Sequence, residues 1–154
     1  MKTILALDLG TTTGWAMSEF SKVSSGTVNF KATRFQSADR RFVNFKDWLK
    51  KTLEKTALGE INAVYFEEVR KHIGVDAAHC YGGFKAVLTM FCEEHGVSYQ
   101  GVPVGTIKKF VTGKGNSKKP EMIAAVRSKG FNPKDDNEAD AISLLLCALA
   151  GGKD

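Results

Sequence analysis

Three acidic residues stand among the most apolar segments of the chain. They are Asp8 at the end of the run ILAL, Glu67 at the end of AVYF, and Asp140 within ADAISLLL. An ionised carboxylate is rarely stable in such surroundings without a partner, because its desolvation costs several kcal/mol, comparable to the stability of a whole domain. A divalent cation is the natural counter-charge for several carboxylates. We therefore interpret the three positions, which lie far apart in the sequence, as one metal site assembled by the fold.

The composition indicates one globular domain over residues 1–154. Of the 154 residues, 43% are hydrophobic and 25% are charged, which suits a single core. The N-terminal apolar run is too short for a secretory signal, and no run reaches the ~20 residues of a membrane helix, so we expect a cytoplasmic protein with no membrane partner. Three scattered cysteines and three histidines without metal-ligand spacing favour reduced thiols and argue against a zinc site.

Hydrophobic periodicity predicts five strands and five helices. Short apolar or alternating runs predict strands at residues 3–9, 15–18, 23–30, 62–69 and 97–102, with a turn over residues 10–14 joining the first two as a hairpin. Apolar residues at helical spacing predict helices at residues 41–55, 76–95, 105–113, 120–130 and 137–150. This order is typical of an α/β fold with a mixed five-stranded sheet flanked by helices.

That architecture makes the metal site plausible. The strand at residues 62–69 is almost wholly apolar until its end, which indicates burial on both faces and a parallel position inside the sheet. If it pairs with the first strand, Asp8 and Glu67 become neighbours, and the last helix can lay Asp140 against them. Glu68 should then lie on the opposite face of the sheet, because side chains alternate along a strand.

Basic residues gather in the last third of the chain. The net charge is +5 and the pI is about 9.1, and eight of the basic side chains lie between residues 108 and 134. They are Lys108, Lys109, Lys114, Lys118, Lys119, Arg127, Lys129 and Lys134. Such a segment is either a solvated loop and helix face or, beside a carboxylate site, a surface that contacts the phosphates of nucleic acid. Phe110 within it can stack on a base or anchor the loop to the core.

Four motifs in order give the chain a resemblance to a known family. They are ILALDLGTTTGWA at residues 4–16, FEEV at 66–69, VTGKGNSKK at 111–119 and DDNEADA at 135–141. Together they span most of the chain, from residue 4 to residue 141, and in this order the chain resembles the RuvC-type Holliday junction resolvases of the RNase H-like superfamily. The resemblance implies an RNase H-like fold and a homodimeric endonuclease that cuts four-way DNA junctions. It also implies two Mg²⁺ ions per active site, with Mn²⁺ as a substitute, and a product with a 5′-phosphate.

The resemblance implies four acidic metal ligands. Asp8, Glu67 and Asp140 match three of them. The family places the fourth, an Asp or His, three residues before the last, where this chain has Asn137. Asp136, four residues before Asp140, faces the same side of a helix, so we assign it as the fourth ligand, with Asn137 as a neutral rival.

The acidic residues beside Asp136 and Asp140 are expected to have other roles. Asp135 is expected to be the N-cap of the last helix, which makes it the weakest candidate for the fourth ligand. Glu138, two residues from Asp140, should point away from the site.

The resemblance also implies roles for several basic residues. Lys119 matches a basic position near the active site of the family and is the candidate for neutralising charge on the phosphate, with Lys118 beside it. Lys108 matches another basic position, which grips backbone phosphate. The predicted DNA-binding set is Lys108, Lys109, Lys114, Lys118, Lys119, Arg70 and Lys71.

The chain departs from the family in one place and carries two unusual glycines in another. The family often has an aromatic residue shortly after the strand-four glutamate, thought to wedge into the junction, whereas this chain has Arg70 and Lys71. Junction opening then relies on charge, or the preferred substrate is another branched DNA.

Gly82 and Gly83 lie where the family forms its dimer interface, and indicate either close approach of a partner helix or a break in the helix.

Three alternatives stay open at the level of sequence. The DLGTT segment is also similar to the phosphate-binding hairpin of actin-like ATPases and sugar kinases, although those proteins need a second such domain. Another alternative is an RNA-directed nuclease of the YqgF-like group in the same superfamily. The third is a non-catalytic protein that binds branched DNA.

Overall fold

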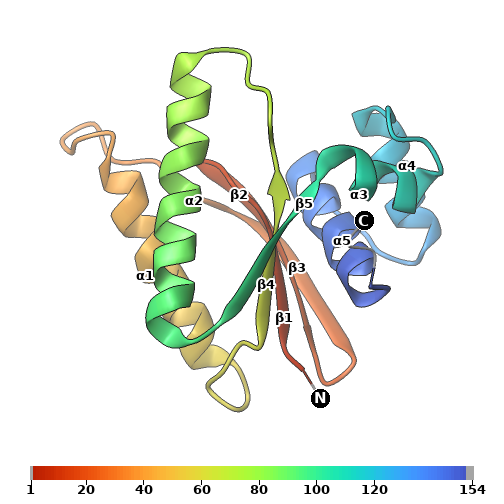
Figure 1. Ribbon diagram of the computed structural model, residues 1–154, viewed down its shortest axis with the longest axis horizontal. Helices are drawn as coiled ribbons and strands as arrows, with labels where there is room; N and C mark the ends of the chain where they lie inside the picture. The colour runs from red at the N-terminus through yellow and green to blue at the C-terminus, as the bar shows by residue number, and fades with distance from the viewer. Residues whose placement is uncertain (1, 152–154) are drawn as a thin grey trace.

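The computed structural model describes residues 2–151, and its centre is one mixed sheet of five strands (Figure 1). The strands are β1 (Ile4–Asp8), β2 (Thr12–Glu19), β3 (Lys22–Asn29), β4 (Ala63–Glu68) and β5 (Ser98–Pro103), in the order β3-β2-β1-β4-β5. β1, β4 and β5 run parallel to one another, whereas β2 and β3 are antiparallel to their neighbours. The mixed five-stranded α/β fold predicted from the sequence is confirmed. Residues 1 and 152–154 of the predicted domain lie outside the described residues, and the extent of the domain stays a prediction.

Five helices cover the two faces of the sheet. They are α1 (Arg40–Lys55), α2 (Val75–His95), α3 (Val104–Thr112), α4 (Lys119–Ser128) and α5 (Asp136–Leu149). α1 and α2 lie on one side of the sheet, and α3, α4 and α5 lie on the other (Figure 1). Each side has its own apolar core because successive side chains of a strand point to opposite faces.

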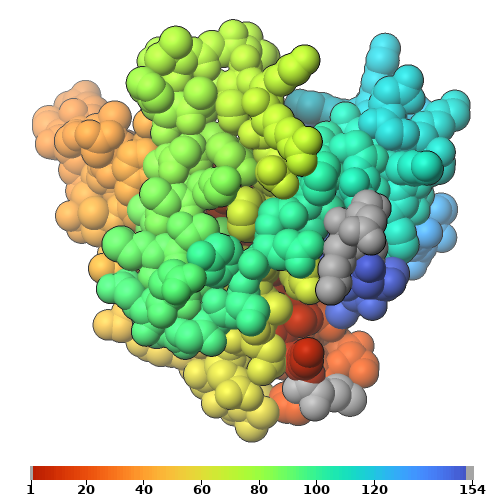
Figure 2. Space-filling view, viewed as in Figure 1, coloured from red at the N-terminus to blue at the C-terminus, as the bar shows by residue number. Residues whose placement is uncertain are grey.

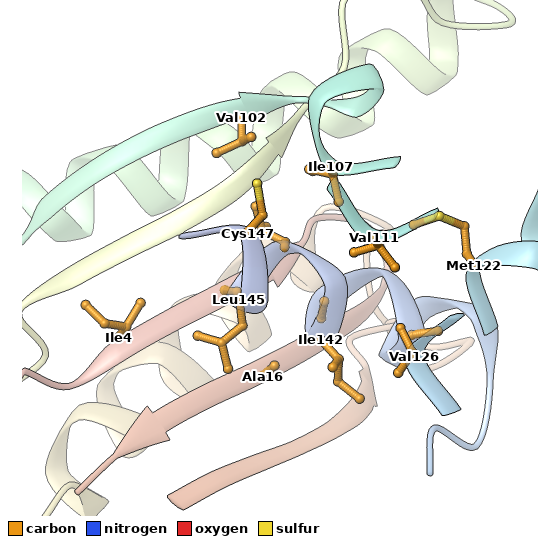
Figure 3. Close-up of a cluster of buried hydrophobic side chains, with 14 residues drawn as sticks. Ile4, Ala16, Val102, Ile107, Val111, Met122, Val126, Ile142, Leu145 and Cys147 are labelled. Atoms are coloured by element: carbon orange, nitrogen blue, oxygen red, sulfur yellow. The ribbon is translucent and has the colours of Figure 1, made fainter. Parts of the chain in front are cut away.

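The alternation along β1 and β4 decides what faces α5. Ile4 and Ala6 of β1 belong to the core cluster that α5, α3 and α4 form, and Figure 3 shows Ile4 at one end of this cluster, on the side of Leu145. Leu5 and Leu7 pack instead against α1 and α2. By the same alternation, the side chain of Asp8 continues the α5 side, so the packing that buries the strand also directs its final carboxylate.

The predicted turn over residues 10–14 is too long. β2 already begins at Thr12, and Gly14 pairs with Asp8 on one side and Thr27 on the other. The glycine is required there because α5 begins directly above it: a Cβ on Gly14 would lie 1.9 Å from the carbonyl oxygen of Asn137. The close approach of a helix to the strand, and not a turn, accounts for Gly14. The other element boundaries fall within a few residues of their predicted positions.

The alternative of a helix break at Gly82 and Gly83 is wrong. α2 runs without interruption from Val75 to His95. A Cβ on Gly83 would lie 2.5 Å from the ring of Phe42, so this glycine lets α1 approach α2 within the same chain. Gly82 has open space around its Cβ position.

Between residues 2 and 151, every helix is too short or too polar to cross a bilayer.

The contact at Gly14 predicts an opposite response of two glycines to the same substitution. Gly14→Ala should lower the free energy of unfolding by about 2–3 kcal/mol, because its methyl group meets backbone atoms that cannot rotate away. Gly82→Ala should raise it by about 0.5–1 kcal/mol, because alanine is the better helix former and its methyl group meets no other atom of the same chain. Urea denaturation at matched protein concentration measures both. Equal stability of Gly14→Ala and the wild-type protein would contradict the packing described here.

Candidate metal centre

Two of the three predicted carboxylates are brought together by strand pairing. β1 and β4 are adjacent and parallel, with Leu7 opposite Phe66, so Asp8 and Glu67 follow at the same end of neighbouring strands. Ala63 and Tyr65 of β4 pack with the α5 core. Glu67 continues that face, as Asp8 does on β1.

The third carboxylate comes from the first turns of α5. The start of this helix is held by the side chain of Asp135, which accepts a hydrogen bond from the Glu138 backbone N–H at 2.8 Å and another from Thr27 at 2.8 Å. The N-cap predicted at Asp135 is therefore confirmed. With the helix fixed over Gly14, Asp140 lies against the ends of β1 and β4.

The three carboxylates form one compact group. One oxygen from each of Asp8, Glu67 and Asp140 lies within 4.8 Å of the others, and all three residues are partly buried. It is the one group of three or more Asp, Glu, His or Cys residues with such spacing in residues 2–151. The structure thus brings together residues separated by 132 positions of the sequence.

Burial and mutual repulsion raise the pKa values in this group. Burial raises the pKa of Asp8 well above its usual range, and the charge of Glu67, a hydrogen bond with Glu67 and the charge of Asp140 add to it. Burial, followed by the charges of Glu67 and Asp136, raises the pKa of Asp140 to about 7, although Lys108 and Lys119 act in the opposite direction. Without a cation the cluster therefore retains protons near neutral pH.

The donor set suits a hard divalent cation. All three side chains offer carboxylate oxygens, which are the ligands that Mg²⁺, Mn²⁺ and Ca²⁺ prefer. A bound cation would also replace the protons that the crowded carboxylates otherwise hold. The residues present therefore fit a divalent metal, as the sequence predicted.

Asp136 lies near the group but outside its closest contacts. Its carboxylate pairs with the Lys119 ammonium at 3.1 Å, and its charge helps to raise the pKa values of Asp8 and Asp140. The same hydrogen bond and charge raise the pKa of Lys119. The structure thus places both predicted residues at the edge of the cluster, joined to each other.

The other acids near the site point elsewhere. Glu68 lies on the opposite side of the sheet from Glu67 and forms an ion pair with Arg70 at 3.6 Å. Glu138 is buried and accepts hydrogen bonds from Ser25 on β3 and from the Lys134 backbone N–H. Both were expected to face away from the cluster, and both do.

The predicted basic residues lie in four places, of which one is shared with the carboxylates. Lys108 and Lys119 line a hollow of about 130 Å³ together with Glu67 and Asp140. Arg70 and Lys71 line a neighbouring hollow beside Glu68, and Lys109 lines a third one with Phe110. Lys114 and Lys118 are exposed in the loop between α3 and α4.

Sequence reasoning assigned no role to Tyr81. Its hydroxyl donates to the Glu67 carbonyl at 2.7 Å and accepts from the Val69 N–H at 3.3 Å, so α2 holds the end of β4 on which Glu67 stands. Burial raises its pKa, with a smaller effect of the nearby acidic charges, which keeps the phenol neutral. A tyrosine within a helix gives no sequence signal of this contact.

Comparison with solved structures identifies the class of fold. No protein-family model matches the chain, and no curated protein matches its sequence. Solved structures do match, and they share the RNase H-like α/β architecture predicted from the motifs.

Two of the matching structures are of RuvC from Thermus thermophilus, and a third is a mitochondrial Holliday junction resolvase. T. thermophilus RuvC in complex with a Holliday junction substrate aligns with a TM-score of 0.80 and 20% identity over 99% of this chain and 96% of that chain. A second Thermus thermophilus RuvC structure aligns with a TM-score of 0.73 and 19% identity over 97% of each chain. The yeast mitochondrial Holliday junction resolvase Ydc2 aligns with a TM-score of 0.50 and 13% identity over 92% of this chain and 75% of that chain.

The crowding of carboxylates predicts that the metal-free site destabilises the fold at high pH. A carboxyl group whose pKa is raised in the folded state destabilises it above that pKa, and this effect disappears as the pH falls toward the unfolded value. With Asp140 at a pKa of about 7, Asp140→Asn should stabilise the metal-free protein by roughly 1–3 kcal/mol at pH 8 and by much less at pH 5. Urea denaturation in EDTA at the two pH values measures this.

Asp135→Asn is the matched control, because Asp135 is on the same helix end but caps it. It should give no stabilisation at either pH. Destabilisation by Asp140→Asn at pH 8 would contradict the repulsion inferred for the cluster.

Proposed function

We propose that the protein is a metal-dependent, structure-selective endodeoxyribonuclease that resolves four-way DNA junctions by paired nicks. The observation that carries the proposal is the cluster of Asp8, Glu67 and Asp140, flanked by Lys108 and Lys119, on a fold whose solved examples include a RuvC bound to a Holliday junction. An acidic metal site surrounded by lysines suits hydrolysis of a phosphodiester, where a cation and basic side chains both face the anionic backbone.

The carboxylates would hold the metal. We assign Asp8, Glu67 and Asp140 as ligands and Asp136 as the fourth, with two Mg²⁺ ions per active site or Mn²⁺ in their place. Bound divalent ions supply charge neutralisation at the phosphate and an acidified water as nucleophile, so no protein nucleophile is required. Water adds to phosphorus and the bond to the 3′ oxygen breaks, which leaves a 5′-phosphate and a 3′-hydroxyl that a ligase can rejoin.

Lys119 has a second anionic partner available in the proposed complex. It pairs with Asp136 in the structure, and three quarters of its side chain is exposed. If Asp136 held a metal ion, the Lys119 ammonium would be free to donate to a phosphate in the hollow that it lines with Lys108. We assign Lys119 to stabilising the developing negative charge and Lys108 to holding the phosphate.

The remaining basic residues are assigned to the DNA backbone. Lys109, Lys114, Lys118, Arg70 and Lys71 are exposed around the cluster, and DNA affinity depends mainly on such phosphate contacts. They carry no sequence information by themselves, which agrees with recognition of a branched shape.

We further propose that the protein acts as a homodimer through the outer face of α2. Val75, His79, Gly82, Ala86 and Met90 recur at helical spacing and are exposed, while the opposite side of the helix is buried in the core. Figure 2 shows α2, in green, across the surface that faces the viewer. An apolar stripe on a helix already packed on its other side suits a second copy of the chain. Two copies supply the two active sites that paired nicks require.

The direct test is cleavage of labelled DNA. In Mg²⁺ the wild-type protein should place paired nicks in a synthetic four-way junction and leave a linear duplex and an RNA–DNA hybrid intact, with no cutting in EDTA. Asp8→Asn and Glu67→Gln should lower the rate at least a thousandfold while junction binding stays within about threefold, because both side chains serve the metal and not the distant phosphates.

Glu68→Gln is the matched control, since this neighbouring carboxylate faces the other side of the sheet. It should cut at close to the wild-type rate. Cutting of only the hybrid or RNA would indicate the RNA-directed alternative. Tight junction binding without cutting in either Mg²⁺ or Mn²⁺ would indicate a binding protein.

Lys119 should act on the chemical step. Lys119→Ala should reduce the single-turnover cleavage rate by about 10²–10³-fold with at most a threefold loss of junction affinity. Lys114→Ala, which removes an exposed charge from the adjoining loop, should mainly weaken binding. Single-turnover kinetics at saturating protein separate the two effects. An unchanged rate for Lys119→Ala would remove this residue from the mechanism.

The proposed interface is tested by sedimentation equilibrium. Ala86→Glu places a charge in the exposed apolar stripe and should convert a dimer into monomers at micromolar concentration. Ala124→Glu, at an exposed position of α4, is the matched control and should remain dimeric. A wild-type protein that is monomeric with and without DNA would contradict the dimer, as would an unaltered Ala86→Glu dimer.

A further inference from the structure

A second basic surface lies on the segment between β3 and α1, away from the lysines already described. Lys31, Arg34, Arg40 and Arg41 lie within eleven residues, with Asp39 as the one acid among them. None of the four pairs with a carboxylate among residues 2–151. The segment therefore presents positive charge that the described chain does not neutralise.

Arg41 is held in place but incompletely bonded. Its Nη1 donates to the Thr11 hydroxyl at 3.4 Å, and its guanidinium lies 5.0 Å from the centre of the Phe42 ring. Its Nε is buried and has no hydrogen-bond partner in residues 2–151. A buried donor without a partner costs folding free energy. An arginine whose guanidinium is fixed in orientation and has further N–H groups to donate is the usual receptor for a phosphate. Arg41 lines a hollow of about 490 Å³ together with Thr11, Lys31, Thr33, Arg34 and Gln36.

Phe35 adds an aromatic surface to the same segment. It is the most exposed aromatic side chain in residues 2–151, at 84%, and the Arg34 guanidinium lies 4.7 Å from the centre of its ring. A large apolar ring so exposed contributes almost nothing to the core. An exposed ring among arginines is instead the pattern of side chains that stack on unpaired bases.

The segment between β3 and α1 begins close to the metal centre. The Phe30 N–H donates to the Thr11 carbonyl at 2.7 Å, and Thr11 follows Asp8 by three residues, so their Cα atoms are at most about 11 Å apart. That is the length of a few nucleotides of one strand. Figure 1 shows this segment, the loop after β4 and the loop between α3 and α4 at the same end of the molecule.

We propose that residues 31–41 form a second DNA-binding site, in which Arg41 and Thr11 hold a backbone phosphate and Phe35 stacks on an unpaired base at the branch point. This rests on the proposed function. Phe35 would then supply the aromatic contact from the segment between β3 and α1, because the chain has the charged residues Arg70 and Lys71 after Glu67 of β4. Since linear duplex offers no unpaired base, Phe35 should favour branched DNA, whereas Arg41 should serve any DNA.

The test for Phe35 is binding of a fluorescein-labelled four-way junction and a matched duplex, measured by anisotropy in EDTA so that no cutting occurs. Phe35→Ala should weaken junction binding about tenfold and leave duplex binding within twofold. It should also abolish the fluorescence change of 2-aminopurine at the branch point, and Phe35→Trp should retain both signals. Leu58→Ala, at another exposed apolar side chain, is the control and should change nothing.

Arg41 is tested in the same assay. Arg41→Gln should weaken binding of both DNAs about five- to tenfold and lower the slope of log affinity against log salt by about 1. Lys50→Gln, nine residues further along α1, is the matched control. Thermal melting establishes that the variant is folded, and Arg41→Lys, which keeps the charge, should restore the salt slope.

The outcomes separate this site from the proposed function. If the wild-type protein binds and cuts junctions but Phe35→Ala retains both its affinity and its 2-aminopurine signal, the second site is wrong and the proposed function stands. If the wild-type protein neither prefers nor cuts junctions, the proposed function is overturned and the second site with it.

Discussion

Mutual repulsion among three half-buried carboxylates is the main electrostatic cost built into this fold. Asp8, Glu67 and Asp140 are forced together by elements that are themselves well packed, so the protein cannot relieve the repulsion by moving one of them away. It responds instead by holding protons, and burial is the main reason that the pKa of Asp140 rises to about 7. A site of this kind is less stable empty than occupied, which is typical of a functional centre.

The surroundings suit an anionic polymer as the partner of that centre. Lys119 is already engaged with Asp136, and Lys108 faces the same hollow as Glu67 and Asp140. Positive side chains beside negative ones give a site that attracts a phosphate and a cation together. Further arginines and lysines extend the positive surface on both sides of the carboxylates.

Much of the fold follows from periodicity in the sequence, and the errors have physical causes. The apolar runs that end at Asp8 in β1 and at Glu67 in β4 are recognisable because burial on both faces of the sheet leaves a continuous apolar sequence. Gly14 is predicted as a turn residue because local sequence does not reveal that α5 begins above it.

The contacts of the site are harder to predict. Tyr81 lies far in sequence from Glu67, which it contacts, and Arg41 lies far from Thr11. The pairing of Asp136 with Lys119 likewise depends on how α4 and α5 meet.

A titration of the metal-free protein with Mn²⁺, followed by electron paramagnetic resonance of the free ion and by calorimetry, tests directly whether Asp8, Glu67 and Asp140 form a metal centre. The proposed function predicts two Mn²⁺ ions bound per chain and displaced by Mg²⁺. The raised pKa values of the cluster predict proton release on binding at pH 7, since the cation replaces protons held by the carboxylates. Asp8→Asn should lose this binding. Binding that is absent from the wild-type protein, or that survives unchanged in Asp8→Asn, would contradict a metal centre at these residues.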